Sequence, residues 1–169
     1  MASPSKQKGH PVAPVRCLWG HLCSLSSIDN ERNNLSLFNI IEQLNIPQGA
    51  FDEHVKTKKI IIIPADYEIV LLWTRTLDID GINDALSFDF SLKVIDPTNK
   101  VIQQTIATAN FPRESKRVRF RIRSNGMPVT IPGSYRFDVE VKRDGKDEFE
   151  NTNGIPLEIK PIVSKLPIG

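Results

Sequence analysis

The sequence predicts an all-β fold, an antiparallel β-sandwich of eight or nine short strands with Greek-key connections and little helix. Two segments, 117–123 and 135–142, alternate strictly between apolar and charged residues. A β-strand sends successive side chains to opposite faces, so each segment has one face for a core and one for solvent. Turn-forming residues recur at intervals of roughly 8–12 residues, as they do in sandwiches, and no long segment has a convincing helical repeat.

The composition favours one domain. We expect a flexible N-terminal tail over 1–13 and a single β-sandwich domain over 14–169, since a chain of 169 residues is enough for one core. The net charge is +2 and Lys6 and Lys8 account for it, so the rest of the chain is balanced and has no general attraction to nucleic acid or anionic membrane. No apolar run approaches the roughly 20 residues that span a bilayer, and no signal peptide is evident, so we expect a cytoplasmic protein.

The strands are predicted in order from apolar runs and the turns between them. Ser26–Asn34, Asn45–Thr57 and Leu77–Leu86 are expected as loops, the second with room for one helical turn. Pro156 and Pro161 mark the last strand as an edge, because proline cannot donate to a ladder. The expected strands are Val15–Leu25, Leu35–Leu44, Lys59–Ile63, Tyr67–Thr76, Ser87–Ile95, Val101–Phe111, the two runs of Lys116–Val141, and Ile155–Val163.

Three local features of this layout need comment. Leu35–Leu44 fits a helical stripe and also a strand, and we favour the strand because it can pair with the first run. Asn125 and Gly126 form a strong turn signal between the two runs of Lys116–Val141. Cys17 and Cys23 lie in one strand, about 20 Å apart at ~3.3 Å per residue, which is too far for a disulfide. We therefore expect both thiols to be reduced and buried.

Two stretches resemble known proteins. Residues 132–139, PGSYRFDV, resemble the penultimate strand of immunoglobulin-like sandwiches, in which a glycine turn leads into a tyrosine and alternating apolar residues. Residues 17–44 are similar to the opening of a family of small uncharacterised bacterial proteins, whose first strand carries a cysteine and is followed by a polar turn and an apolar strand. The resemblance implies an immunoglobulin-like sandwich of unknown function, with no catalytic motif.

The most visible candidate site is a ladder of four arginines, Arg117, Arg119, Arg121 and Arg123, on one face of a predicted strand. It could grip an acidic partner or follow the phosphates of a nucleic acid. It could equally be a solvated face that cross-strand acids such as Asp89, Asp138 or Glu140 neutralise. Phe120 falls on the core side, so the basic face lacks the aromatic platform that binders of single strands interleave with their cations.

Two further candidates are weaker. Asp78, Asp80 and Asp84 alternate near Gly81 as carboxylates do in calcium loops, although Ile82 interrupts the pattern, and a polar loop is the simpler interpretation. His21 and Cys23 share a strand face but nothing completes a metal site or a catalytic pair, so packed core residues are expected.

No sequence motif of the common hydrolases, phosphate loops, dinucleotide folds or zinc proteases occurs. Trp19 and Trp73 are expected to anchor the core; an exposed tryptophan would instead mark a partner site.

These observations favour a non-enzymatic protein-interaction or accessory module without a cofactor or metal. Its expected partner is another protein, with self-association left open. Two alternatives remain: polyanion or nucleic-acid binding through Arg117–Arg123, and calcium binding by the Asp78–Asp84 loop.

Overall fold

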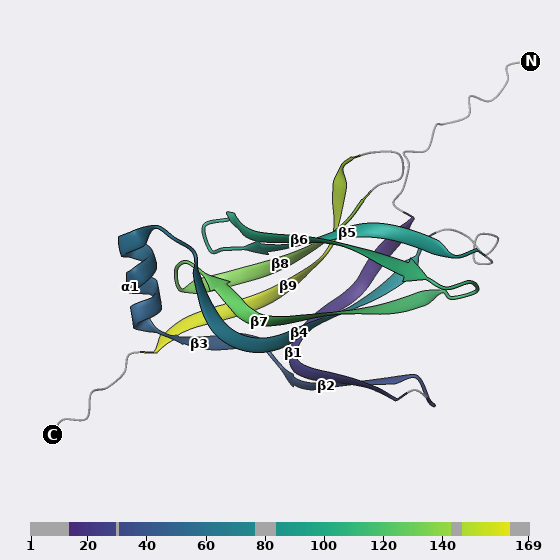
Figure 1. Ribbon diagram of the computed structural model, residues 1–169, viewed down its shortest axis with the longest axis horizontal. Coiled ribbons are helices and arrows are strands. Elements are labelled where there is room, and N and C mark those ends of the chain that lie inside the picture. The colour runs from purple at the N-terminus through teal and green to yellow at the C-terminus, as the bar shows by residue number, and fades with distance from the viewer. Residues whose placement is uncertain (1–13, 30, 77–83, 143–146, 163–169) are drawn as a thin grey trace, which may run out of the picture.

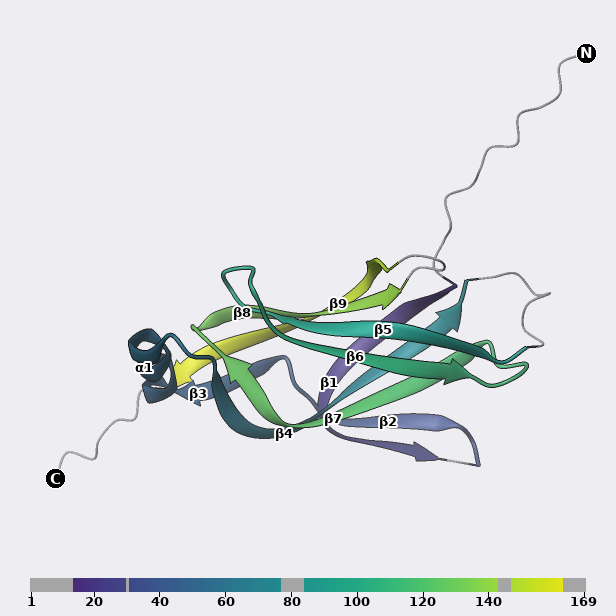
Figure 2. The ribbon, with the colours of Figure 1, turned by 45° about the horizontal axis from the view of Figure 1, so that its top comes forward.

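The computed structural model describes residues 14–29, 31–76, 84–142 and 147–162, so the expected tail 1–13 lies outside the described residues. Two β-sheets pack face to face and one helix lies at one end of them, which confirms the all-β sandwich (Figures 1 and 2). No helix in this part of the chain is long and apolar enough to cross a membrane. The elements are β1 (Val15–Asp29), β2 (Asn34–Ile40), β3 (Gln43–Pro47), α1 (Gln48–Thr57), β4 (Ile61–Arg75), β5 (Leu86–Ile95), β6 (Val101–Phe111), β7 (Arg117–Val129), β8 (Gly133–Lys142) and β9 (Phe149–Ile162).

The strand order is β2-β1-β4-β7 in the four-stranded sheet and β3-β9-β8-β5-β6 in the five-stranded sheet. All neighbours are antiparallel except β3 and β9, which run parallel, so the expectation of a purely antiparallel fold was wrong at that edge. Strand β7 is therefore an edge of one sheet and β6 an edge of the other. These two edges lie on the same side of the sandwich (Figures 1 and 2).

The core fills the space between the sheets. Alternate residues of β4 point inward, ending at Trp73, whose ring lies 4.9 Å from that of Phe88 and 5.3 Å from that of Phe90. The apolar row of β8, from Tyr135 to Val141, faces them as the alternation predicted. Each of these large side chains is almost fully buried, and burial of such a side chain stabilises the fold by roughly 1.5–3 kcal/mol.

The turn predicted at Asn125 and Gly126, between the two alternating runs of Lys116–Val141, does not form. Strand β7 continues through Asn125 and Gly126 and pairs with β4, whereas β8 belongs to the other sheet. A Cβ added at Gly126 would lie 2.6 Å from Cγ2 of Ile62, so this glycine serves close strand approach and not a turn. The chain changes sheet after Val129, just before β8.

Other expectations also need correction. The loop expected at Ser26–Asn34 is mostly strand, because β1 extends to Asp29 and β2 begins at Asn34. Leu35–Leu44 does contain a strand that pairs with β1, but the chain then leaves for the other sheet as β3. The loop expected at Asn45–Thr57 contains the ten-residue helix α1. The strands expected separately at Lys59–Ile63 and Tyr67–Thr76 are one strand, β4, with an irregularity between Pro64 and Tyr67. Strand β9, with its two prolines, is an interior strand and not the expected edge.

A network around Asp96 ties β5, β6 and the start of β8 together. Its carboxylate accepts hydrogen bonds from the hydroxyl (2.6 Å) and backbone nitrogen (2.8 Å) of Thr98, from the backbone nitrogen of Lys100 (3.0 Å) and from the hydroxyl of Thr130 (3.0 Å). Burial opposes ionisation, yet these hydrogen bonds outweigh it and hold the pKa of Asp96 below its ordinary value. The hydroxyl of Tyr135 accepts from the Thr130 nitrogen at 2.9 Å and donates to the carbonyl of Ile131 at 2.7 Å.

Candidate functional site

The arginine ladder lies on the outer face of the four-stranded sheet. Phe120 and its two apolar neighbours on β7 point toward the core, as the alternation predicted. The acids expected to neutralise the ladder do not face it, because their strands belong to the other sheet. There Asp89 binds Thr108, Asp138 binds Arg136, and Glu140 binds Lys93.

Register across β1, β4 and β7 places each arginine at the end of a cross-strand row. Residues of one row share the face and lie within reach of each other's side chains. β4 supplies the middle residue of each row, so an acid at such a position lies beside the arginine of its own row and near that of the next row. From one end to the other, the rows are Arg16–Thr74–Arg117, Trp19–Leu72–Arg119, His21–Val70–Arg121 and Cys23–Glu68–Arg123.

Glu68 is a buried carboxylate of this face, only 4% exposed. It accepts hydrogen bonds from the backbone nitrogen of Ser26 (2.8 Å), the hydroxyl of Ser26 (2.5 Å) and Nε of Arg123 (2.9 Å), and Nη1 of Arg121 lies 4.0 Å away. Burial opposes ionisation, but the bonds from Ser26 and Arg123 and the charge of Arg121 outweigh it, so the pKa of Glu68 lies below its ordinary value. Two arginines of the ladder thus serve a buried carboxylate.

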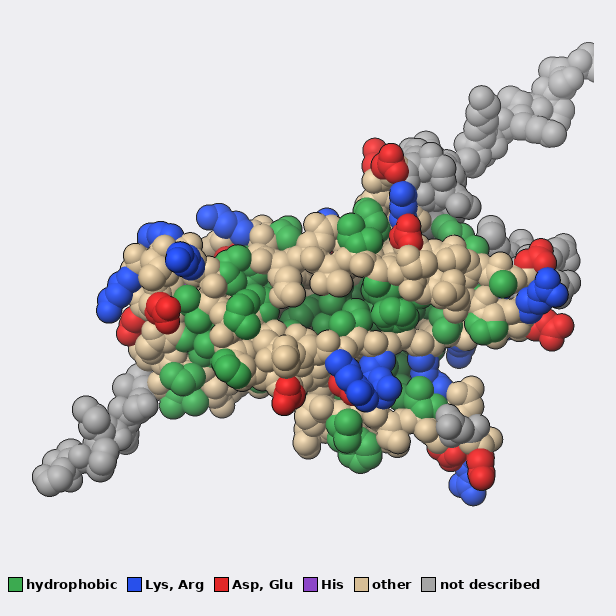
Figure 3. Space-filling view, in the orientation of Figure 1, with side chains coloured by type: hydrophobic (Ala, Val, Ile, Leu, Met, Phe, Trp, Pro, Cys, Tyr) green, Lys and Arg blue, Asp and Glu red, His purple; other side chains and the backbone are tan. Residues whose placement is uncertain are grey.

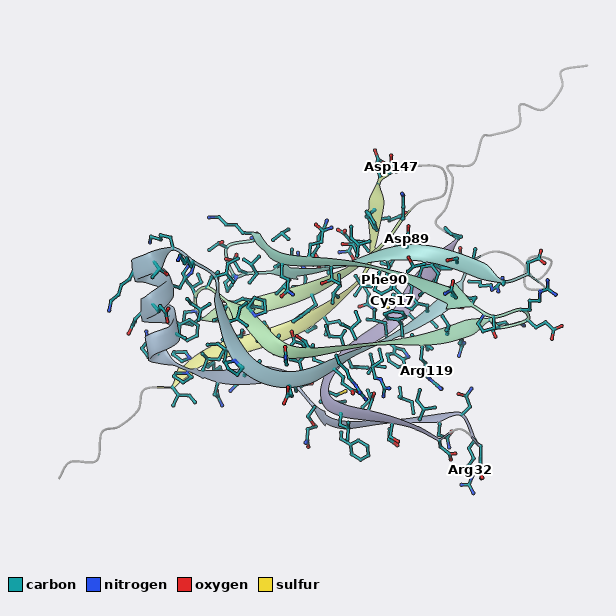
Figure 4. All side chains as sticks on the ribbon, viewed as in Figure 1. Cys17, Arg32, Asp89, Phe90, Arg119 and Asp147 are labelled. Atoms are coloured by element: carbon teal, nitrogen blue, oxygen red, sulfur yellow. The ribbon has the colours of Figure 1, made fainter. Side chains whose placement is uncertain are left out.

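The hairpin of β1 and β2 folds over the same face. The register of β1 with β4 ends at Cys23, and beyond it β1 pairs with β2 alone (Figure 1). Arg121 donates from Nη1 to the carbonyl of Ser26 at 3.3 Å. Arg119 donates from Nη1 and Nη2 to the side-chain and main-chain oxygens of Asn33, at 2.7 and 2.9 Å. Arg119 consequently lies between the hairpin and the sheet, as Figure 4 shows.

A groove lies between the tip of the β1–β2 hairpin and the start of β7. Its volume is about 470 Å³, and its lining includes Ile28, Leu72, Val118, Arg117 and Arg119. No carboxylate lines it among the described residues. Within that part of the chain the guanidinium of Arg117 makes no hydrogen bond or ion pair, and that of Arg119 donates hydrogen bonds only to the neutral Asn33. The groove therefore offers two uncompensated cations beside an apolar wall.

Trp19 and His21 also lie on this outer face, with ring centroids 5.3 Å apart. The expectation that Trp19 anchors the core was wrong, although it holds for Trp73. A shift in register between Cys17 and Trp19 inserts one extra residue, Leu18, and reverses the alternation of β1. Cys17 consequently faces the core while Trp19 faces outward and is partly exposed. Sequence alternation carries no signal of such a bulge.

Both cysteines are free and buried, as predicted. Burial raises the pKa of Cys17 to about 11, so its thiol stays protonated at neutral pH. The pKa of Cys23 is also raised, by burial and by the charge of Glu68. Although His21 and Cys23 share a face, no group of three or more histidine, cysteine or acidic side chains among the described residues could hold a metal ion.

The calcium hypothesis rests largely on residues outside the described ranges. Asp78 and Asp80 fall within 77–83, and of the loop's three aspartates only Asp84 is described. Its backbone carbonyl accepts a hydrogen bond from Nη2 of Arg75 at 2.7 Å.

Comparisons with known proteins assign no family. No family model matches the sequence, and no curated protein matches it. Among solved structures, the chain is similar to a family 123 glycoside hydrolase from Clostridium perfringens, which was studied for glycolipid glycan hydrolysis. The similarity covers 88% of this chain and 28% of that enzyme chain, with 12% sequence identity and a TM-score of 0.38. We carry no residue role over from that enzyme.

Proposed function

We propose that this chain is a non-enzymatic protein-interaction module that binds an acidic segment of a partner protein at the groove beside Arg117 and Arg119. The supporting observation is that a carboxylate lies beside the arginines at one end of the ladder and not beside those at the other end. Arg121 and Arg123 meet the carboxylate of Glu68, whereas no carboxylate lines the groove among the described residues. Arginine suits this role because its planar guanidinium binds carboxylates in a bidentate manner.

Arg119 contributes geometry as well as charge. Its two hydrogen bonds to Asn33 hold the guanidinium in place before any partner binds, which lowers the entropic cost of binding. The apolar wall of Leu72, Val118 and Ile28 can cover the aliphatic part of an acidic side chain or an adjacent apolar residue. A groove with fixed cations and an apolar wall fits a short acidic segment of a protein.

The fold proposal is an immunoglobulin-like sandwich with Greek-key connections, from a family of small bacterial proteins that work in the cytoplasm. Its support is the contact between the Tyr135 hydroxyl and the backbone at Thr130 and Ile131, which resembles the tyrosine corner of such sandwiches. Gly133, with φ of 135°, adopts a backbone conformation that favours glycine and precedes this strand as the resemblance implies.

Binding of a glutamate-rich peptide tests the proposed function. In titration calorimetry we expect the Arg117→Glu, Arg119→Glu double variant to bind at least tenfold more weakly than the parent chain, a change of about 1.4 kcal/mol. The matched control is Lys56→Glu, Lys59→Glu, which makes the same charge change at and just after α1. Equal binding by the ladder variant and the parent would refute this proposal.

A second candidate function is binding of single-stranded nucleic acid, and Trp19 favours it. Its indole lies on the same face as the ladder, in the row of Arg119, and so supplies the aromatic side chain that β7 itself lacks there. Trp19→Ala should weaken binding of a single-stranded oligonucleotide, since stacking contributes roughly 1–3 kcal/mol per base, and leave peptide binding unchanged. Equal binding of the oligonucleotide by both chains would count against this candidate.

A further inference from the structure

The side of the sandwich between β6 and β7 is open. Both strands are sheet edges, and neither has a second neighbour among the described residues. A cleft of about 200 Å³ opens between them, with Tyr67, Leu92 and Phe137 among its lining residues. Figure 3 shows hydrophobic side chains in a hollow along this side of the molecule. Apolar core surface is thus accessible beside an unpaired strand edge.

The composition of β6 explains why the cleft is open. Register with β5 places Gln103, Thr105 and Ala107 on the inward row of β6, opposite Val94, Leu92 and Phe90. The first two are polar and exposed, and the alanine is small, so this row does not close the core. Across the cleft Ile122 of β7 remains half-buried. Apolar side chains from one more strand would complete this part of the core.

We propose that an extended segment of the acidic partner adds to the edge of β7 as a further strand, with acidic and apolar residues alternating along it. Strand addition uses the main-chain hydrogen bonds of the edge for affinity and alternate side chains for specificity. Apolar residues of the added strand enter the cleft, and the acidic residues between them lie on the outer face. This inference rests on the proposed function, because it assigns how the acidic partner binds.

Charge complementarity identifies the occupant. The arginines stand at every second position of the outer row of β7, so an added strand has a cross-strand neighbour for each of them. Opposite charges at such positions are stabilising and like charges are destabilising. A second copy of β7 would place arginine against arginine, which disfavours pairing of β7 with itself. The ladder thus selects a strand with acids at alternate positions.

The test compares two peptides with the full chain by titration calorimetry. One is an end-blocked peptide of about nine residues, the length of a long strand, in which glutamate and valine alternate. The other has the same composition with its glutamates and valines in separate blocks. We expect the alternating peptide to bind at least tenfold more tightly. Equal binding overturns strand addition and leaves the proposed function standing, whereas no binding of either peptide overturns both.

Backbone pairing is tested with N-methylated alternating peptides. Methylating every glutamate nitrogen blocks one edge of the peptide strand, and methylating every valine nitrogen blocks the other, since alternate N–H groups point to opposite edges. At least one of the two should bind tenfold more weakly than the unmethylated peptide. If both bind as tightly as it does, no ladder of hydrogen bonds forms and the inference is wrong.

Two variants of β6 test the cleft itself. Thr105→Phe fills the cleft from the inward row at an exposed position, where an added ring displaces no packed side chain. It should weaken the alternating peptide at least tenfold and leave the block peptide unchanged. Gln104→Phe makes the corresponding change on the opposite face of β6 and should alter neither. Unchanged binding of the alternating peptide to Thr105→Phe would exclude insertion into this cleft.

Discussion

The two halves of the arginine ladder are alike in sequence and different in their surroundings. Arg121 and Arg123 meet Glu68, a buried carboxylate that also holds the β1–β2 hairpin through Ser26. Arg121 reaches Glu68 from the neighbouring row, since its own β4 residue is the neutral Val70. Arg117 and Arg119 lie farther from Glu68 along β7, and no carboxylate lines their groove among the described residues. The neighbouring strand, and not the arginine strand itself, therefore separates a structural half from a half that remains available for binding.

Burial makes the structural half the stronger determinant of stability. A charge in a low-dielectric environment interacts more strongly with its partners, and it costs more when those partners are removed. Glu68 is in such an environment, whereas the side chain of Arg123 is 68% exposed. Loss of the carboxylate should consequently destabilise the protein more than loss of either arginine that serves it.

The largest expected effect is that of Glu68→Ala. This change leaves Arg123 without its acid, Ser26 without its acceptor and the hairpin without its attachment to β4. We expect the free energy of unfolding to fall by about 3 kcal/mol, because two buried donors of Ser26 are left without an acceptor, each at a cost of about 1–3 kcal/mol. Urea denaturation followed by tryptophan fluorescence measures it. A decrease in the free energy of unfolding below about 0.5 kcal/mol, the usual range of surface substitutions, would show that the contacts of Glu68 do not stabilise the fold.

A smaller difference in the free energy of unfolding is expected between variants of Arg123 and Arg117. Arg123→Met keeps much of the aliphatic stem and removes the charged hydrogen bond to Glu68, so it should cost about 1 kcal/mol, since the arginine is largely exposed. Arg117→Met should change the free energy of unfolding by less than about 0.5 kcal/mol. Both variants are compared in one urea series. Equal losses would remove the distinction between the two halves of the ladder.

Alternation along the chain was sufficient to predict the sandwich and much of its core. The inward rows of β7 and β8 follow directly from it, as does the placement of all four arginines on one face. Glu68 was also within reach of such reasoning, because it is the one acid in the predicted strand Tyr67–Thr76, between Tyr67 and Ile69. An acid in an otherwise apolar run indicates a buried partner.

The pairing of strands could not be predicted in the same way. Asn125–Gly126 has the composition of a hairpin turn, yet both residues lie within β7, where Gly126 pairs with Pro64 of β4. Tertiary pairing thus overrides a local turn preference. The bulge at Leu18 reverses the faces of β1 and brings Trp19 into the row of Arg119. Register is a property of two strands at once, so neither the acid-free groove nor the aromatic side chain beside it is visible in the β7 sequence alone.

The pH dependence of the unfolding free energy should also distinguish the Glu68 half of the ladder from the Arg117 half. This is the smallest of the three expected effects on stability. The pKa of Glu68 is lowered in the folded protein, so the unfolded chain binds this proton more readily. The stability it contributes is present above its unfolded pKa of about 4.3 and is lost as the pH falls through the lower folded value. Glu68→Gln should therefore flatten the decline of unfolding free energy below about pH 5.

Part of the decline should persist, because the pKa of Asp96 is lowered as well. Arg117→Met is the control and should follow the parent curve. A Glu68→Gln curve parallel to the parent would show that folding does not lower the pKa of this carboxyl.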